Sequence, residues 1–341
     1  MKEFASDNLS GICKEVLDKI IEANNKHDKG YSFDSYTKKA RELMQNEFTK
    51  KVDSYILANG SGANILALKS LLRPHESVIC CKQTHINVHE VGGLESISGN
   101  KILTVDSKDA KLSVEMIKPL LTLKGDFNAV QPKVIAISQP TELGTVYTNE
   151  EIKAICDFAH EHEMYVFVDG ARISNALVYL NTTLKEMIED TGVDVFNFGG
   201  TKNGAMAVEM VVFLNKVLAK DFIYIQKQGM QMMSKSRFFG AQMVGLLEDK
   251  VYLKNAKHAN EMAYYLASKL KELNVTFTQK VETNALFIKM DKDVYDKLQE
   301  KYYFYINNPF INEVRLVTTF DTSKKLIDKF ISDYKMILEN K

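Results

Sequence analysis

The sequence predicts an α/β fold in which a mostly parallel, seven-stranded sheet forms a large domain, followed by a small α+β domain. From residue 54 to 215, short β-branched runs alternate with amphipathic helical segments. This alternation is typical of a parallel sheet that helices cover on both faces. After Leu214 the pattern changes to long helical segments and then to short strands. We therefore expect an N-terminal arm and large domain over residues 1–245, and a small C-terminal domain over residues 246–341.

The expected elements follow from the spacing of apolar residues. Residues 9–50 are expected to be helical in two segments. Val16, Ile20 and Ile21 recur at helical spacing in the first, and Tyr36, Ala40, Leu43 and Met44 in the second. The strands expected in the large domain are Tyr55–Ala58, Val78–Cys81, Ile102–Val105, Val134–Ser138, Tyr165–Val168, Val193–Phe198 and Met210–Leu214. The small domain is expected to hold strands Val275–Thr278, Ala285–Lys289 and Arg315–Thr319, a helix near Val294–Tyr302 and a closing helix from Ser323.

Composition indicates an ordinary soluble protein. Of its 341 residues 45% are hydrophobic and 26% are charged, and 44 basic residues balance 44 acidic ones. This balance argues against a nucleic-acid or anionic-membrane partner. The four cysteines have no CxxC spacing and are expected to be reduced, and no apolar run approaches the roughly 20 residues that span a bilayer. With no signal-like segment at the N-terminus, the expected location is cytoplasmic.

Two apolar runs lead to residues that carry chemistry. Val166–Val168 leads to Asp169, and Val193–Phe198 leads through glycines to Lys202. Pyridoxal phosphate needs such a pair, because a carboxylate keeps its pyridine nitrogen protonated and an amine holds its aldehyde as a Schiff base. Taken singly, Asp169 is better explained as a helix cap and Lys202 as a solvated turn lysine. Their occurrence together, at the ends of consecutive predicted strands, favours the catalytic interpretation.

Two further segments follow predicted strands. The glycine-rich turn 59–64, with Ser61 and Gly62, opens a helix and would present main-chain N–H groups to a phosphate. His85 would lie over the same edge of the sheet, where its ring can stack on a pyridine and assist proton transfer. A tight turn that simply needs glycine, and a loop histidine bonded to main chain, are the structural alternatives. His85, His89 and Glu90 lack a third ligand with convincing spacing, so no metal is expected.

Two arginines are candidates for binding a carboxylate. Arg172 lies three residues after Asp169, within reach of a cofactor oxygen or a substrate carboxylate. Arg315 begins an apolar run in the small domain, where an inward-facing guanidinium suits bidentate capture of an amino acid. The alternative for Arg315 is an edge-strand residue paired with Glu313 or Asp321.

Taken together, these segments resemble the low-specificity L-threonine aldolase family of pyridoxal phosphate enzymes, nearly from end to end. The resemblance is carried by the segments Phe4–Asn8, Gly60–Leu68, Thr84–Asn87, Asp169–Arg172, Thr201–Gly204 and Val314–Thr318. It implies the fold-type I, aspartate aminotransferase architecture and a homo-oligomer, dimer or tetramer, with active sites shared across the interface. It also implies a lyase of amino-acid metabolism that cleaves threonine, allo-threonine or related β-hydroxy-α-amino acids to glycine and an aldehyde.

The resemblance also implies residue roles. Lys202 would form the Schiff base, Asp169 would contact the pyridinium, His85 would stack on the ring, and Ser61 with Gly62 would bind phosphate. The substrate would meet a further set of side chains: Ser6, Tyr31, Arg172 and Arg315. The alternative is another fold-type I enzyme acting on a small amino acid, such as a β-eliminating lyase, an aminotransferase or a racemase.

The chain departs from the family pattern in two places. The usual Tyr-Gly-x-Asp is Tyr31–Asp34 here, with Ser32 in place of glycine. Many members carry an Asn-Thr-His segment near the substrate hydroxyl, where this chain has Gln139–Gly144. Glu142 in that segment is a candidate base or, equally, the cap of a turn.

Overall fold

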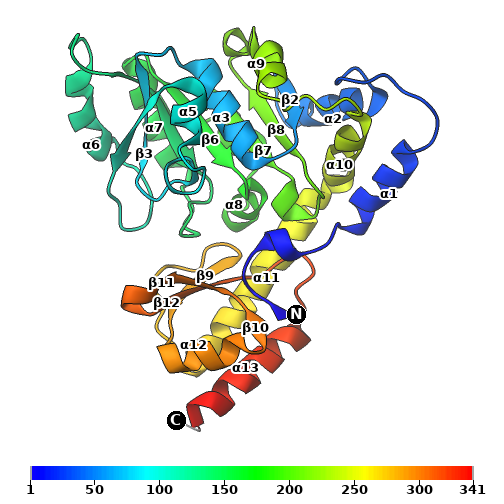
Figure 1. The fold of residues 1–341 in the computed structure, drawn as a ribbon, viewed down its shortest axis with the longest axis vertical. Helices are drawn as coiled ribbons and strands as arrows, with labels where there is room; N and C mark the ends of the chain where they lie inside the picture. Colours follow the sequence, from blue (N-terminus) through cyan, green and yellow to red (C-terminus); the bar gives the residue numbers. More distant parts are fainter. Residues whose placement is uncertain (1, 340–341) are drawn as a thin grey trace.

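A mixed seven-stranded sheet forms the centre of the large lobe in the computed structural model, which describes residues 2–339 (Figure 1). Its strand order is β2-β8-β7-β6-β5-β3-β4, and β8 alone runs antiparallel to its neighbours. The strands are β2 (Asp53–Leu57), β3 (Glu76–Cys81), β4 (Lys101–Val105), β5 (Gln131–Ser138), β6 (Tyr165–Gly170), β7 (Val195–Gly199) and β8 (Glu209–Phe213). All seven predicted strands are therefore confirmed, with ends that differ by a few residues.

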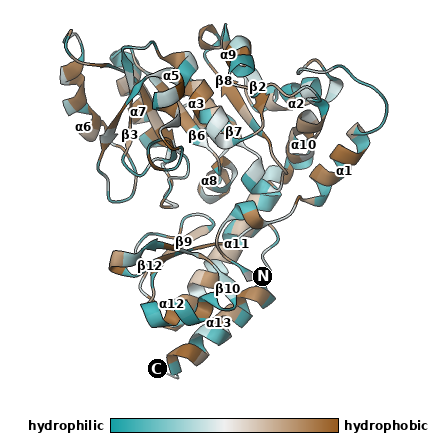
Figure 2. Ribbon diagram, in the orientation of Figure 1, coloured by the Kyte–Doolittle hydropathy of each residue, from teal (hydrophilic) through white to brown (hydrophobic). Residues whose placement is uncertain are grey.

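The sheet separates two hydrophobic cores because successive side chains of a strand point to opposite faces. Val166 and Val168 of β6 belong to one core, whereas Phe167 between them belongs to the other. All three are fully buried. Figure 2 shows the hydrophobic colour on these central strands, as expected for a sheet covered on both faces.

Helices surround this sheet and continue into the small lobe. The α-helices of the large lobe are α1 (Lys14–Ala23), α2 (Ser35–Gln45), α3 (Gly60–Leu71), α4 (His85–Val88), α5 (Gly93–Ser98), α6 (Val114–Ile117), α7 (Asn149–Glu161), α8 (Ile173–Leu180), α9 (Phe222–Gln228) and α10 (Arg237–Leu247). Those that follow are α11 (Val251–Glu272), α12 (Lys292–Gln299) and α13 (Lys324–Glu339). The two helical segments expected within residues 9–50 are confirmed as α1 and α2, and the segment that links them contains left-handed residues such as Lys26 and Tyr31.

The small lobe contains an antiparallel sheet of order β11-β12-β9 and a short parallel pair, β1-β10. Its strands are β9 (Ala285–Lys289), β10 (Tyr302–Tyr303), β11 (Tyr305–Asn308) and β12 (Glu313–Val317), and β1 (Lys2–Glu3) comes from the N-terminal arm. The expected strand Val275–Thr278 is wrong, since only Phe277 makes a bridge, to Ile288.

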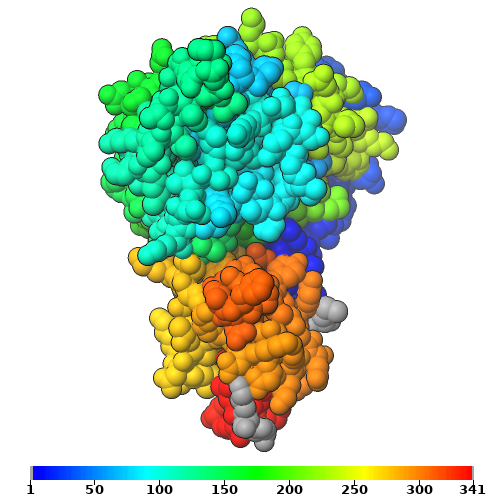
Figure 3. All heavy atoms as spheres, turned by 60° about the vertical axis from the view of Figure 1, so that its left-hand side comes forward, coloured from blue at the N-terminus to red at the C-terminus, as the bar shows by residue number. Residues whose placement is uncertain are grey.

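Helix α11 joins the two lobes. Its first turn, with Tyr252, packs in the large lobe's core, whereas Met262 and Leu270 further along pack in the small lobe's core. Figure 3 shows the larger lobe above the smaller yellow-to-red one. The division into two domains near residue 245 stays a prediction. Among the described residues, no helix combines the length and the apolar character needed to cross a membrane.

Candidate active site

The predicted site residues come together at one edge of the large sheet. Strands β2, β3, β5, β6 and β7 run in the same direction, so their carboxyl ends share this edge. Asp169 lies near the end of β6, and Lys202 follows β7 in a short 3-10 turn, Thr201–Asn203. Because β8 runs antiparallel, its first residue, Glu209, lies at the same edge and pairs with Gly199.

Asp169 is buried and uses both carboxylate oxygens. Its Oδ1 accepts the main-chain N–H of Ala171 at 3.0 Å, and its Oδ2 accepts the side-chain amide of Asn64 at 2.8 Å. The first contact is a turn over two residues rather than the helix cap that the sequence suggested, because α8 begins at Ile173 with Arg172 as its N-cap. The second contact ties β6 to helix α3, in which Asn64 is buried.

Lys202 is partly buried beside several charged side chains. Burial and the nearby Arg172 guanidinium lower the pKa of the Lys202 amine, while Asp7 and Asp169 act in the opposite direction. A lowered pKa increases the fraction of neutral, nucleophilic amine. The turn ends on Gly204, whose φ of 100° is unfavourable for residues with a Cβ. Lys202 is therefore not the solvated turn lysine of the alternative interpretation.

Glu209 is a fully buried carboxylic acid close to Lys202. Burial raises its pKa to about 7, against the opposing effects of Thr201 and Lys202. Within the described part of the chain, its Oε2 is buried without a hydrogen-bond partner. At neutral pH the protonated and ionised forms of Glu209 are therefore both populated, next to the amine of Lys202.

His85 opens helix α4 shortly after β3, and two glutamates hold it, the buried Glu90 and the half-buried Glu142. Its Nδ1 lies 2.8 Å from Glu90 Oε1, and its main-chain N–H donates to Glu142 Oε1 at 2.7 Å. The hydroxyl of Ser138 also donates to Glu142, at 2.7 Å. Burial raises the pKa of both glutamates. Glu142 thus accepts the first N–H group of the helix that carries His85, which is a capping role. The other role considered for Glu142, that of a base, stays a prediction.

Arg172 forms a bidentate pair with Asp7 of the N-terminal arm. Its Nε donates to Asp7 Oδ2 at 2.6 Å, and its Nη2 donates to Oδ1 at 2.7 Å. Asn284 of the small lobe also donates to Asp7, at 3.1 Å. Burial raises the pKa of Asp7, but the Arg172 guanidinium outweighs it and holds the pKa below its usual value. The arm, the sheet edge and the small lobe therefore meet at one carboxylate.

Arg315 lies in β12, the middle strand of the small sheet, rather than on an edge. Its Nη2 donates to the carbonyl of Ala5 at 3.1 Å, and its guanidinium lies over the ring of Tyr305 at 5.1 Å. Burial and the proximity of Arg172 lower its pKa. The pairing with Glu313 suggested as an alternative is not formed, because Glu313 accepts from Asn307 instead.

The glycine-rich turn opens α3 as predicted, but one of its main-chain N–H groups, that of Gly62, already has a hydrogen-bond partner. Asn59 caps the helix by accepting the N–H of Gly62 at 2.8 Å. A Cβ at Gly62 would lie 2.6 Å from the Gln231 side chain, which would have to move to admit it. Gln231 in turn accepts the N–H of Ala58 at 3.0 Å. Ser61 lies on the partly exposed side of this turn.

The other two predicted substrate residues do not contact Lys202 within this chain. Ser6 accepts the N–H of Asn8 at 3.2 Å and thereby begins the turn that contains Asp7. Tyr31 is 46% exposed, and Lys227 lies 4.7 Å from its ring centroid. The next residue, Ser32, has φ of 71°, the conformation for which the family's glycine is suited.

Sequence reasoning gave no role to four residues that shape the site: Asp7, Asn64, Glu90 and Glu209. Two of them left a readable signal. Asn64 directly precedes the apolar run Ile65–Leu68 of α3, and Glu209 begins a strand that is otherwise apolar. Polar residues in such positions are rarely buried without a function. Asp7 left no such signal, because its partner Arg172 lies 165 positions away.

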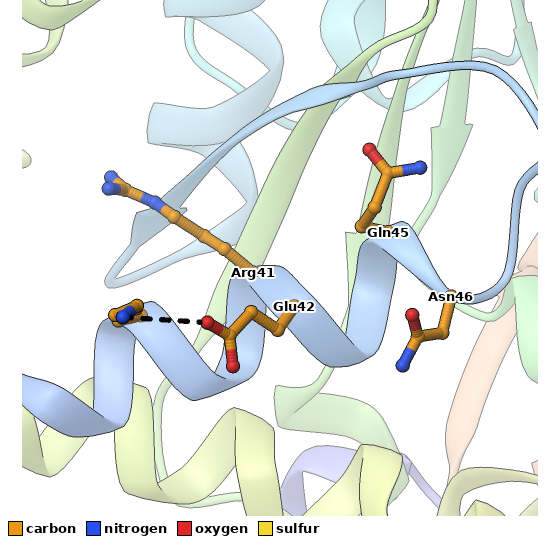
Figure 4. Close-up of a pocket in the computed structure, with 5 residues that line it drawn as sticks. Arg41, Glu42, Gln45 and Asn46 are labelled. Atoms are coloured by element: carbon orange, nitrogen blue, oxygen red, sulfur yellow. Dashed lines mark ion pairs between the residues drawn. The ribbon is translucent and has the colours of Figure 1, made fainter.

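A separate hollow lies along the exposed face of α2 (Figure 4). It measures about 300 Å³ and is lined by Lys38, Arg41, Glu42, Gln45 and Asn46. Its side chains project from a single helix, and Lys38 forms an ion pair with Glu42 at 3.8 Å. It lacks the convergent groups of the sheet edge, so we assign the chemistry to that edge.

Comparison with solved structures defines the class. An aspartate aminotransferase from Thermotoga maritima superposes with a TM-score of 0.75 at 18% identity, covering 99% of this chain and 92% of that one. A threonine aldolase from Leishmania major superposes with a TM-score of 0.95 at 29% identity, covering 99% of this chain and all of that one. The fold is therefore that of the fold-type I pyridoxal phosphate enzymes.

Sequence comparison identifies the family. The model of the Beta-eliminating lyase family matches residues 3–293. A low specificity L-threonine aldolase from a Pseudomonas species is 36% identical over 342 residues, covering 99% of this chain and 98% of that protein. The corresponding protein of Pseudomonas aeruginosa is 35% identical over the same length. The chain belongs to the beta-eliminating lyase family and, within it, to the low specificity L-threonine aldolases.

Proposed function

We propose that this protein is a pyridoxal phosphate-dependent aldolase that cleaves β-hydroxy-α-amino acids, such as L-threonine and L-allo-threonine, to glycine and an aldehyde. The observation that carries the proposal is the arrangement at the sheet edge. An amine of lowered pKa, Lys202, lies beside the buried carboxylate of Asp169, with Arg172 near them. Family membership supports the same reaction.

The residues present fit pyridoxal phosphate. Lys202 offers a nucleophilic amine for covalent attachment of the aldehyde, and Asp169 a buried carboxylate for the pyridine nitrogen. Gly60 and Ser61 begin α3, and the main-chain N–H groups at a helix N-terminus favour a phosphate. When bound, the cofactor supplies an electron sink for the pair of electrons released from the broken Cα–Cβ bond.

Each side chain then has a task of its own. With the cofactor bound, Asp169 would hold a proton on the pyridine nitrogen, His85 would lie against the ring, and Ser61 with Gly62 would hold the phosphate. Arg172 and Arg315 hold the substrate carboxylate, with contributions from Ser6 and Tyr31. Because Gly62 already donates to Asn59, we expect Ser61 and the neighbouring N–H groups to provide the remaining phosphate contacts.

Orientation is the main contribution of the arginines. With the substrate carboxylate fixed, the two arginines would restrict the orientation of the Cα–Cβ bond that is to be broken. A base must also remove the proton of the β-hydroxyl group as the aldehyde leaves. His85 is our candidate, because Glu90 occupies its Nδ1 and leaves Nε2 to accept a proton.

The test is aldehyde release from threonine, allo-threonine and phenylserine by the cofactor-loaded protein. We expect glycine and aldehyde in equal amounts. A second candidate function is β-elimination, which is favoured by the family model that spans residues 3–293. Elimination would yield ammonia and a keto acid, so analysis of the products from threonine and serine separates the two. Ammonia without glycine would overturn the aldolase proposal.

We further propose a homo-oligomer, a dimer or tetramer, in which Tyr31 acts in the neighbouring subunit's site. Exposed apolar side chains next to the glycine-rich turn support this: Phe33 is 69% exposed and Met230 82%. Tyr31 belongs to the same surface, because its main-chain N–H donates to the carbonyl of Ser234, a few residues after Met230, at 3.3 Å. Light scattering combined with rescue of activity on mixing Lys202→Ala and Tyr31→Ala chains tests the idea. A monomer with full activity would contradict it.

We also propose a cytoplasmic location. All four cysteines are buried and free, which suits a reducing compartment.

A further inference from the structure

A continuous chain of hydrogen bonds links His85 to Asp169. His85 Nδ1 lies 2.8 Å from Glu90 Oε1. The amide nitrogen of Asn64 donates to the same Glu90 oxygen at 3.0 Å and to Asp169 Oδ2 at 2.8 Å. The two residues expected to contact the cofactor ring, from α4 and β6, are thus joined through two side chains that need not contact it.

With Glu90 ionised, the hydrogen bonds along this chain point to one tautomer of His85. The Asn64 amide nitrogen has two hydrogens, and the two carboxylates take both. Glu90 Oε1 is an acceptor, so the proton shared with His85 belongs to Nδ1. In the neutral ring, Nε2 then carries the lone pair. The His85 side chain is 34% exposed, whereas that of Glu90 is fully buried. The nitrogen that can accept a proton, Nε2, is therefore on the more exposed of the two residues.

Among the described residues, the polar contacts of the Glu90 side chain are all made by one carboxylate oxygen, which binds His85 and Asn64. Within residues 2–339, its Oε2 is buried without a hydrogen-bond partner, so both of its polar contacts pass through Oε1. The main chain of His85 is fixed separately, by Glu142. The backbone and the ring of His85 therefore have independent anchors, and Glu90 is the anchor of the ring.

We propose that Glu90 is a positioning residue that fixes His85 as its Nδ1–H tautomer and, through Asn64, sets the orientation of Asp169, so that the two ring-contacting residues act as a unit. The part that concerns the cofactor rests on the proposed function. The tautomer itself is a property of the protein alone.

The first measurement is the ¹⁵N NMR spectrum of the imidazoles at pH 8, with the His85 signals assigned by their loss in His85→Gln. We expect the Nδ1–H tautomer in the wild-type protein and in Glu90→Gln, because an amide carbonyl still accepts this proton. Glu90→Leu removes the acceptor, and we expect the Nε2–H form to appear. Glu95→Gln, an exposed glutamate on α5, is the matched control and leaves the spectrum unchanged.

A dominant Nε2–H tautomer in the wild-type protein would overturn the proposal, and this outcome does not depend on a folded Glu90 variant. Retention of Nδ1–H in Glu90→Leu would do the same. The second readout uses the cofactor-loaded protein, in which Glu90→Leu should move the cofactor's absorption maximum. It should also lower kcat roughly tenfold to a hundredfold, as for carboxylates that orient histidines at metal sites. KM should change little, because the arginines are untouched.

The two proposals can fail separately. If the wild-type protein cleaves threonine while Glu90→Leu leaves both kcat and the tautomer unchanged, the positioning role of Glu90 is wrong and the aldolase stands. If the tautomer responds as expected but no β-hydroxy amino acid is cleaved, the aldolase is wrong and the hydrogen-bonded chain stands.

Discussion

The edge of the large sheet and the core of the small lobe are both buried, yet opposite kinds of residue build them. At the sheet edge, Glu90, Glu142 and Glu209 each bury a carboxylate oxygen that has no hydrogen-bond partner among the described residues. The small lobe's core is apolar, with Phe330 packed 5.0 Å from Phe4, measured between ring centroids. Burying an oxygen without a hydrogen-bond partner destabilises the folded state, whereas burying an aromatic ring stabilises it. The small lobe thus supplies stability, and the sheet edge supplies reactivity.

The largest effect should follow from Lys202→Ala at the sheet edge. Activity should fall by several orders of magnitude, because the covalent attachment of the cofactor is lost. Borohydride reduction followed by peptide mass mapping should label Lys202 in the wild-type protein and no residue in the variant. The free energy of unfolding should not decrease, since a buried amine is removed. A label on another lysine would contradict the assignment.

The opposite result is expected from Phe330→Ala in the small lobe. Phe330 is fully buried among aromatic rings, so the variant should lose about 3–5 kcal/mol of unfolding free energy. Urea denaturation measures this loss, and Phe127→Ala, at a site 94% exposed, is the control that should change little. Borohydride labelling of Lys202 should persist in the folded fraction. Loss of the label from a folded variant would break the distinction between the two regions.

Glu209→Gln tests the same contrast at the sheet edge, because this substitution should raise the free energy of unfolding at neutral pH. The pKa of Glu209 is about 7 when folded, against 4.5 for the ordinary side chain. Between these values the folded state binds more protons than the unfolded state, so stability falls as pH rises. The expected loss is roughly 3 kcal/mol, and it is complete above pH 7.

Glu209→Gln should remove this loss and flatten the dependence of unfolding free energy on pH between about 4.5 and 7. Urea denaturation at pH 5 and pH 8 gives the measurement. Equal pH dependence in the variant and the wild-type protein would show that Glu209 is not the group responsible.

Arg315→Ala probes the side of the site that the small lobe contributes. We expect KM for threonine to rise tenfold or more, corresponding to about 1.4 kcal/mol or more of lost binding, with a smaller change in kcat. Steady-state kinetics give both constants. The exposed Arg73 provides the control variant, Arg73→Ala, which should keep the wild-type KM. An unchanged KM in Arg315→Ala would make this arginine purely structural.

The smallest effect should come from Ser32→Gly. Ser32 has φ of 71°, a conformation that costs roughly 1–2 kcal/mol with a Cβ. The gain from glycine is reduced by its greater freedom in the unfolded chain, so the net stabilisation should stay below about 1 kcal/mol. Thermal unfolding measures it, with Ser32→Ala, which keeps the Cβ, as the control. Equal melting temperatures for the two variants would contradict this account.

The two regions also differ in how well the sequence predicts them. The strands of the large sheet were predicted because they are short apolar runs between polar helices, and Asp169 and Lys202 follow directly from them. In the small lobe, the expected helix near Val294–Tyr302 ends at Gln299, and the chain continues into β10 and β11. Residues 305–308 alternate between exposed and partly buried, so they lack the apolar run that reveals a strand.

The contacts of the site are a separate matter, because they join distant parts of the chain. Glu90 reaches Asn64 across 26 positions, and Asp169 reaches the same amide across 105. Local spacing identifies a polar residue after a strand but does not identify its partner. The role of Glu90 therefore became visible only when the hydrogen bonds were known.

The N-terminal arm has a consequence for the order of events during synthesis. Ala5 accepts a hydrogen bond from Arg315, which lies 310 positions further along the chain, and Lys2 pairs with Tyr302. Domains tend to fold as they leave the ribosome, but the arm cannot dock until β12 has been synthesised. Asp7 belongs to the arm. A nascent chain that stops short of β12 would therefore lack the docked arm that places Asp7 against Arg172, so the site can form only after β12 has been made.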